Sequence, residues 1–173
     1  MSSLLFRCSV FVLALAISAQ PKEYKAKEEK LPGDPVKQPI AYSHKIHVAQ
    51  GMKCVNCHTM PGDGFAATYP KETMCMGCHS SIKKESPEIQ KLAAIAAKKE
   101  PVPWERVYRL PDIIWFNHAV HVKQAKAECS VCHGEVAQRD VLFQEKSISM
   151  QTCMACHAAQ GAPNGCDVCH ASQ

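Results

Sequence analysis

Cysteine and histidine recur together in this chain of 173 residues, which contains 11 cysteines and 9 histidines. Ten of the cysteines fall in five copies of the pattern Cys-x-x-Cys-His, and the eleventh, Cys8, lies near the N-terminus. The motif cysteines are Cys54 and Cys57, Cys75 and Cys78, Cys129 and Cys132, Cys153 and Cys156, and Cys166 and Cys169. Two thiols at this spacing can each add to one vinyl group of a haem, and the adjacent histidine is then held beneath the iron.

The histidine of each motif is therefore the expected proximal ligand of one haem iron. These residues are His58, His79, His133, His157 and His170. A zinc site would take four ligands and use the motifs in pairs, which five motifs do not allow, and zinc gives no reason for the regular histidine. A thioredoxin-like redox motif needs one active dithiol. The sequence thus predicts five covalently bound c-type haems.

The four histidines outside the motifs all lie in a repeated segment. Residues 42–48 (YSHKIHV) match residues 116–122 (FNHAVHV), and each copy holds two histidines three positions apart. Residues at this spacing share one face of a helix, so each pair suits two neighbouring haems. A core or surface role is the usual interpretation of an isolated histidine, but the repeat favours iron ligation. The predicted distal ligands are His44, His47, His118 and His121.

Nine histidines cannot fill the ten axial positions of five haems. One haem must therefore use another sixth ligand or leave that position open. The thioether of methionine is the natural substitute. We expect Met150, three residues before Cys153, to be this ligand, and Met60, two residues after His58, is the alternative.

The motifs also divide the chain into regions. Residues 1–19 contain Arg7, an apolar run and small residues at its end, which is typical of a signal peptide, with an uncleaved anchor as the alternative. Residues 20–41 are charged and then proline-rich, which predicts a flexible tether. The remaining regions form one predicted pentahaem domain, 42–173, with repeat units 42–79 and 116–157, a helical linker 80–115 and a C-terminal haem segment 158–173.

One ordinary helix is expected, in the linker between the units. Ser86 and Pro87 suit a helix start, apolar residues recur at helical spacing from 89 to 96, and Pro101 stops the helix. No strand periodicity stands out, and the chain is short for the number of haems it would carry. We therefore predict a mainly α fold with extensive loops, an irregular multihaem cytochrome c fold built around five stacked haems.

Charge and leader bear on partners and location. The formal net charge is +4 and the sequence pI is about 8.5, but the haem propionates would offset this charge, so nucleic-acid binding is unsupported. The leader predicts export, and hence a periplasmic protein whose membrane contact is indirect or through the N-terminus. Its expected partners are redox proteins.

The residues resemble a known group, the class III multihaem cytochromes c, in which His-x-x-His precedes a Cys-x-x-Cys-His motif. The similarity to the pentahaem subunit of alternative complex III extends over residues 39–157 and includes the run from Pro103 to Tyr108, residues 116–122, Cys132 to Val136, and Ser149 with Met150. This resemblance implies a periplasmic haem chain that carries electrons from a membrane quinol-oxidising complex to a carrier or oxidase. The leader is shorter than the membrane anchor expected of such a subunit.

The resemblance also implies a ligand assignment. His44 would serve the Cys54 haem, and His118 the Cys129 haem. His47 and His121 would serve the haems of the second motifs, with ligation across the two halves left open, and Met150 would be the odd ligand. Two other functions remain as alternatives: a multihaem reductase with one open haem, which would need a cationic substrate pocket, and an extracellular haem filament. The chain has no Cys-x-x-Cys-Lys motif.

Overall fold

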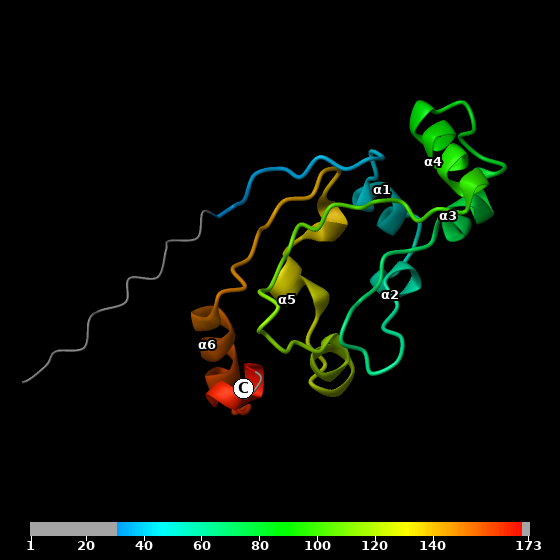
Figure 1. Ribbon diagram of the computed structural model, residues 1–173. Helices are drawn as coiled ribbons and strands as arrows, with labels where there is room; N and C mark the ends of the chain where they lie inside the picture. The colour runs from blue at the N-terminus through cyan, green and yellow to red at the C-terminus, as the bar shows by residue number, and fades with distance from the viewer. Residues whose placement is uncertain (1–30, 171–173) are drawn as a thin grey trace, which may run out of the picture.

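The computed structural model describes residues 31–170 (Figure 1). The predicted signal peptide, residues 1–19, and the first part of the predicted tether lie outside the described residues. The elements are α1 (His44–Ala49), α2 (Cys54–Cys57), α3 (Glu72–His79), α4 (Pro87–Lys98), the π-helix η1 (Val120–Gln124), α5 (Cys129–His133), the 3-10 helix η2 (Val136–Gln138), α6 (Met150–Gln160) and α7 (Cys166–Cys169). Between residues 31 and 170 the only strand-like pairing is an isolated antiparallel bridge between Ile114 and His170. The expected helical, loop-rich fold is confirmed at this level.

The helices are spread along the molecule (Figure 1). Helices α3 and α4 pack against each other at one end, and α6 lies beside the C-terminal α7 at the other. Helices α1, α2 and α5 lie between these ends. Within the described part of the chain, no helix has the length and apolar character needed to cross a membrane.

Helix α4 forms as the sequence predicts, from Pro87 to Lys98. Ser86 precedes it with extended backbone, although its hydroxyl makes no capping hydrogen bond, and Lys99 ends it in the left-handed conformation with φ of 59°. The buried apolar face of α4 centres on Leu92, which packs with Ile40 and Val102. This small cluster therefore fixes α4 against α3 and the connector that follows.

That cluster is the whole buried hydrophobic core of the described residues. Burying one aliphatic side chain contributes about 1.5–3 kcal/mol, whereas ordering one residue of backbone costs roughly 1–2 kcal/mol. Three buried side chains cannot offset the ordering of a chain this long. Apolar side chains are instead exposed between the motif cysteines, as at Val55 (49%), Val131 (56%) and Val168 (39%). The fold thus needs an apolar partner at the motifs, which a porphyrin would supply.

The two halves of the molecule are tied together by an exchange of loops. The loop after α2 receives the second repeated segment: the Asn117 side-chain amide donates to the Asp63 carbonyl (2.9 Å), and the Ala119 N–H donates to the Gly64 carbonyl (3.0 Å). Gly64 has φ of +73°, and a Cβ there would come within 3.0 Å of the Ala119 side chain. Only glycine permits this close approach without strain.

The reciprocal contact joins the chain after α5 to the first repeated segment. Helix η2 packs against α1, the Lys45 N–H donates to the Arg139 carbonyl (3.1 Å), and the Ser43 hydroxyl donates to the Asp140 carboxylate (2.6 Å). Each repeated segment is therefore held by residues that follow the motif of the other half. We call these two contacts together the exchanged loops.

Residues 31–41, the described part of the predicted tether, also contact the rest of the chain. The N–H groups of Gly33 and Val36 donate to the carbonyls of Gln144 (2.7 Å) and Leu142 (2.9 Å). These bonds hold residues 33 and 36 against the extended segment that leads to α6.

Candidate haem sites

Every Cys-x-x-Cys-His motif lies on, or begins, a helical turn. In α2, for example, Lys53 is extended, and its N–H donates to the side-chain oxygen of Asn56 (2.7 Å), which starts the turn at Cys54. Residues three apart on a helix are neighbours on its surface. The two thiols of a motif therefore lie on one side of the turn, and the histidine follows immediately, as attachment to two vinyl groups and one iron requires.

The histidine rings form four pairs, each joining a motif histidine to one from a repeated segment. Two of the pairs are nearly parallel: His44 faces His58 with ring centroids 6.4 Å apart and planes 7° apart, and His118 faces His133 at 6.4 Å and 8°. The distances and angles of the two pairs agree closely, although one pair lies in each half of the chain.

The other two pairs involve the second histidine of each repeated segment. His47 lies 6.2 Å from His79, with planes 67° apart, and His121 lies 5.9 Å from His157, with planes 45° apart. Both members of each pair come from the same half of the molecule, so the ligation across halves that the sequence left open has no support in this arrangement. One repeated segment faces two motifs.

The separation of the rings fits a shared metal. An imidazole nitrogen binds a metal at about 2.0 Å, and the ring centre lies a little over 1 Å behind that nitrogen. Two imidazoles on opposite sides of one iron therefore have ring centres roughly 6 Å apart. All four observed separations, from 5.9 to 6.4 Å, match this value. The residues present thus suit an iron ligated by two histidines at four positions.

Backbone carbonyls set which ring nitrogen is free to bind. A carbonyl only accepts, so a ring whose Nδ1 lies beside one donates from Nδ1 and keeps its lone pair on Nε2. This arrangement holds for His47 with Ser43 (2.7 Å), His58 with Thr68 (2.8 Å), His79 with Ile82 (3.3 Å), His118 with Phe65 (2.9 Å), His121 with Asn117 (2.8 Å) and His157 with Pro163 (2.6 Å). Each Nε2 is then available to an iron.

One aromatic residue braces both rings of each repeated segment. The ring of Tyr42 stacks on His47 at 4.3 Å and meets His44 edge-on at 4.8 Å. Phe116 does the same for His121 at 4.4 Å and His118 at 4.8 Å. The sequence did not suggest a role for these two aromatic residues. Each lies two positions before the first histidine of its own copy of the repeat. That shared position is the signal that would have found them.

Tyr108 braces a motif histidine from the connector. Its ring meets His133 edge-on at 4.8 Å, and its hydroxyl donates to the His133 carbonyl (3.2 Å) while it accepts from the Glu145 N–H (2.9 Å). Arg139 holds the Glu145 carboxylate in turn (2.8 Å). Tyr108 therefore links His133 to the segment that contains Arg139 and Glu145.

Burial keeps two of the central histidines neutral. It lowers the pKa of His44 to about 4, with further lowering by the nearby His58 and His47. Burial also lowers the pKa of His133, followed by the effects of His118 and His58. A neutral imidazole is the form that binds a metal.

The fifth motif differs from the others. The four pairs use eight of the nine histidine rings and leave His170, which lies after α7 at the bridge with Ile114. Met150 is the first residue of α6 and is 67% exposed, and α6 lies beside α7 in Figure 1. Met60 is half-buried in the loop after α2, beside the motif whose His58 already faces His44. No contact between Met150 and His170 is described, so the ligand opposite His170 stays a prediction.

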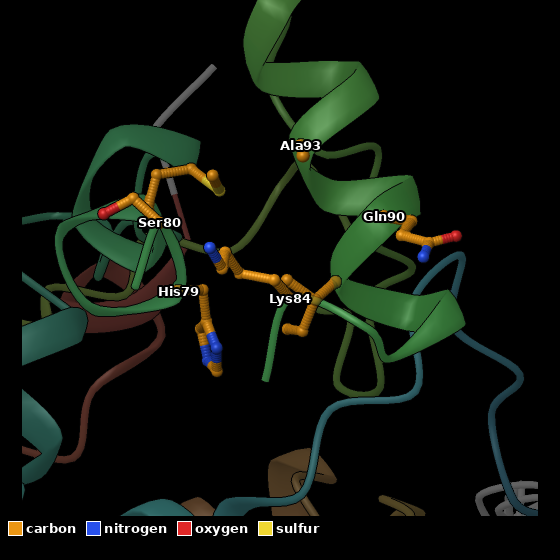
Figure 2. A pocket seen from close by; sticks show the side chains of 7 residues that line it. His79, Ser80, Lys84, Gln90 and Ala93 are labelled. Atoms are coloured by element: carbon orange, nitrogen blue, oxygen red, sulfur yellow. The ribbon is translucent and has the colours of Figure 1, made fainter. Parts of the chain in front are cut away.

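A small cavity of about 170 Å³ lies between α3 and α4. In Figure 2 the side chain of Lys84 reaches across this space toward α3, whereas the imidazole of His79 points away from α4. The apolar side of the cavity comes from Met76, Ile89 and Ala93. His79 is therefore presented on the face of α3 that α4 leaves uncovered.

Comparison with known proteins agrees with this chemistry. Residues 114–171 match the family of cytochrome c7 and related cytochromes c. The chain is also 31% identical, over 160 aligned residues, to the multihaem cytochrome c subunit of menaquinone reductase from Nitratidesulfovibrio vulgaris strain Hildenborough. The alignment covers 77% of this chain and 76% of that subunit. The chain therefore belongs to the multihaem cytochromes c, which bind haem covalently and transport electrons.

Proposed function

We propose that this chain is a periplasmic electron carrier with five c-type haems, and that it relays electrons between a membrane quinone-converting complex and a further redox partner. The observation that carries this proposal is the set of four histidine pairs at the separation that an iron requires. The name of the relative, a menaquinone reductase subunit, supports a quinone-linked partner. Kinship with the pentahaem subunit of alternative complex III remains a prediction, as does the periplasmic location, which rests on residues 1–19.

The proposed roles of the residues follow from their geometry. The paired cysteines of each motif attach one haem, and the motif histidine binds its iron from one side. His44, His47, His118 and His121 bind from the other side of the irons held by His58, His79, His133 and His157, respectively. A bound haem supplies one-electron chemistry at its iron. The protein's own contribution is to fix each imidazole: a carbonyl bond orients the ring, and Tyr42 or Phe116 packs against it.

We further propose that Met150 completes the iron that His170 binds. Thioether ligation favours ferrous iron and raises the reduction potential relative to two imidazoles. The haem of the fifth motif should then be the first to be reduced in a potentiometric titration.

The alternative function is a reductase with an open coordination position, and the unpaired His170 is the observation that favours it. Such an enzyme would show a high-spin haem in the unmodified protein that binds nitrite, sulfite or cyanide readily. A wholly low-spin spectrum that does not change when these ligands are added would reject the reductase and support the electron carrier.

Stoichiometry is the direct test of the proposed function. Five intact motifs predict that the mass of the denatured, matured protein equals the mature polypeptide plus five haems, with no free thiol. The matched control is a Cys166→Ala, Cys169→Ala variant, which should lose one haem. A mass with four or fewer haems in the fully matured unmodified chain would show that at least one motif is misassigned.

A further inference from the structure

The spatial order of the five motifs differs from their order in the sequence. We infer this order from contacts between the segments that carry them, and the inference rests on the proposed function only in requiring that the motifs hold haems. Each haem is named below by the first cysteine of its motif.

The Cys54 and Cys129 motifs are neighbours at the centre of the molecule. The exchanged loops hold the His118 segment beside the loop after α2, and hold α1 beside the chain after α5. The first and third motifs of the sequence are thus adjacent in space.

The Cys75 motif adjoins the Cys54 motif through α1. His44 and His47 lie on this one helix and face His58 and His79, and Tyr42 contacts both helix histidines. Helices α3 and α4 lie beyond this junction, at one end of the molecule (Figure 1).

The Cys153 motif adjoins the Cys129 motif in the same way. His118 and His121 belong to one segment and face His133 and His157. Phe116 packs against both of them.

The Cys166 motif adjoins the Cys153 motif at the far end. The Asn164 side-chain amide donates to the Met154 carbonyl on α6 (3.0 Å), and Trp115 donates to the Cys169 carbonyl (2.7 Å). Helices α6 and α7 lie opposite the α3 and α4 end in Figure 1.

We propose that the five haems form a single unbranched row in the order Cys75, Cys54, Cys129, Cys153, Cys166. The two end haems are then those of the second and fifth motifs of the sequence. Electrons enter and leave at the α3–α4 end and at the α6–α7 end, so the redox partners dock at these two ends. The Cys54 haem, first in the sequence, is an internal member of the row with no partner of its own.

Nuclear Overhauser contacts between haem protons test this order directly. The probe is the full holoprotein, fully reduced and kept under carbon monoxide so that any open-site iron is also diamagnetic. Each haem is assigned from contacts of its thioether protons with the β-protons of its own cysteines. We expect inter-haem contacts for four pairs only: Cys75 with Cys54, Cys54 with Cys129, Cys129 with Cys153, and Cys153 with Cys166.

A contact between any two haems outside these four pairs would overturn the proposed order. So would the lack of any contact between the Cys54 and Cys129 haems. Failure of the proposed function is distinguishable, because a chain with fewer than five haems is recognised by its mass before the spectra are recorded.

Discussion

Replacing Gly64 by alanine should destabilise the junction between the two halves far more than its small size suggests. Gly64 has φ of +73°, and its carbonyl accepts from the Ala119 N–H at 3.0 Å. A Cβ at this position would approach the Ala119 side chain to less than 3.0 Å, so the His118 segment would have to move away. That movement would also stretch the bond from His118 Nδ1 to the Phe65 carbonyl.

The expected loss can be divided into two parts. The left-handed backbone costs an ordinary residue roughly 1–2 kcal/mol, and forcing an extra methyl into a packed contact costs typically about 1–3 kcal/mol. The Gly64→Ala variant should therefore lose about 2–5 kcal/mol of unfolding free energy. This is a large part of the roughly 5–15 kcal/mol that a typical domain has.

Denaturant unfolding of the holoprotein, followed by far-ultraviolet circular dichroism, measures this loss. The matched control is Gly62→Ala, because Gly62 also has positive φ (+56°) but nothing lies within 4 Å of its Cβ position. The control should lose only the backbone part, roughly 1–2 kcal/mol, and Ala119→Gly should rescue Gly64→Ala toward the same value. Equal losses for Gly64→Ala and Gly62→Ala would refute the close contact, and with it the exchanged loop as a structural clamp.

Five further substitutions test the ligands and their supports. His47→Ala and His121→Ala should each convert one low-spin haem to high spin in the electron paramagnetic resonance spectrum, and unchanged spectra in both would make these histidines structural. Met150→Ala should abolish the long-wavelength charge-transfer band of methionine-ligated ferric haem, whereas Met60→Ala should retain it; the reverse result would transfer the role to Met60. The Tyr108 hydroxyl oxygen accepts from two backbone N–H groups, and Tyr108→Phe removes this acceptor. The variant should therefore lose about 1–3 kcal/mol of unfolding free energy in denaturant unfolding.

The helix in the linker could be predicted from local sequence because its signals are local. Ser86 and Pro87 mark its start, and apolar residues at helical spacing from 89 to 96 mark the face that Leu92 buries. The structure differs in one detail: the Ser86 hydroxyl makes no capping hydrogen bond. Helix α4 ends at Lys98, before Pro101, as the sequence suggests.

The ligand types are a prediction from local sequence, because covalent attachment fixes the spacing of cysteine and histidine within each motif. Which motifs lie side by side could not be predicted, since that depends on bonds between distant segments, such as Ala119 to Gly64 and Lys45 to Arg139. Neither segment contains a sequence pattern that indicates which distant segment it contacts. The expected assignment of individual ligands, Met150 included, therefore remains a prediction that the variants above will test.

The exchanged loops also affect how the protein is made. Helix α1 is held in part by Arg139, which leaves the ribosome well after His44 does. In the export proposed above, His44 and the first motif would emerge before the rest of the chain is available to fold around them. The early motifs would stay open to the enzymes that attach haem until the later ones arrive, and a chain cut between the halves would leave both repeated segments without their holding loops.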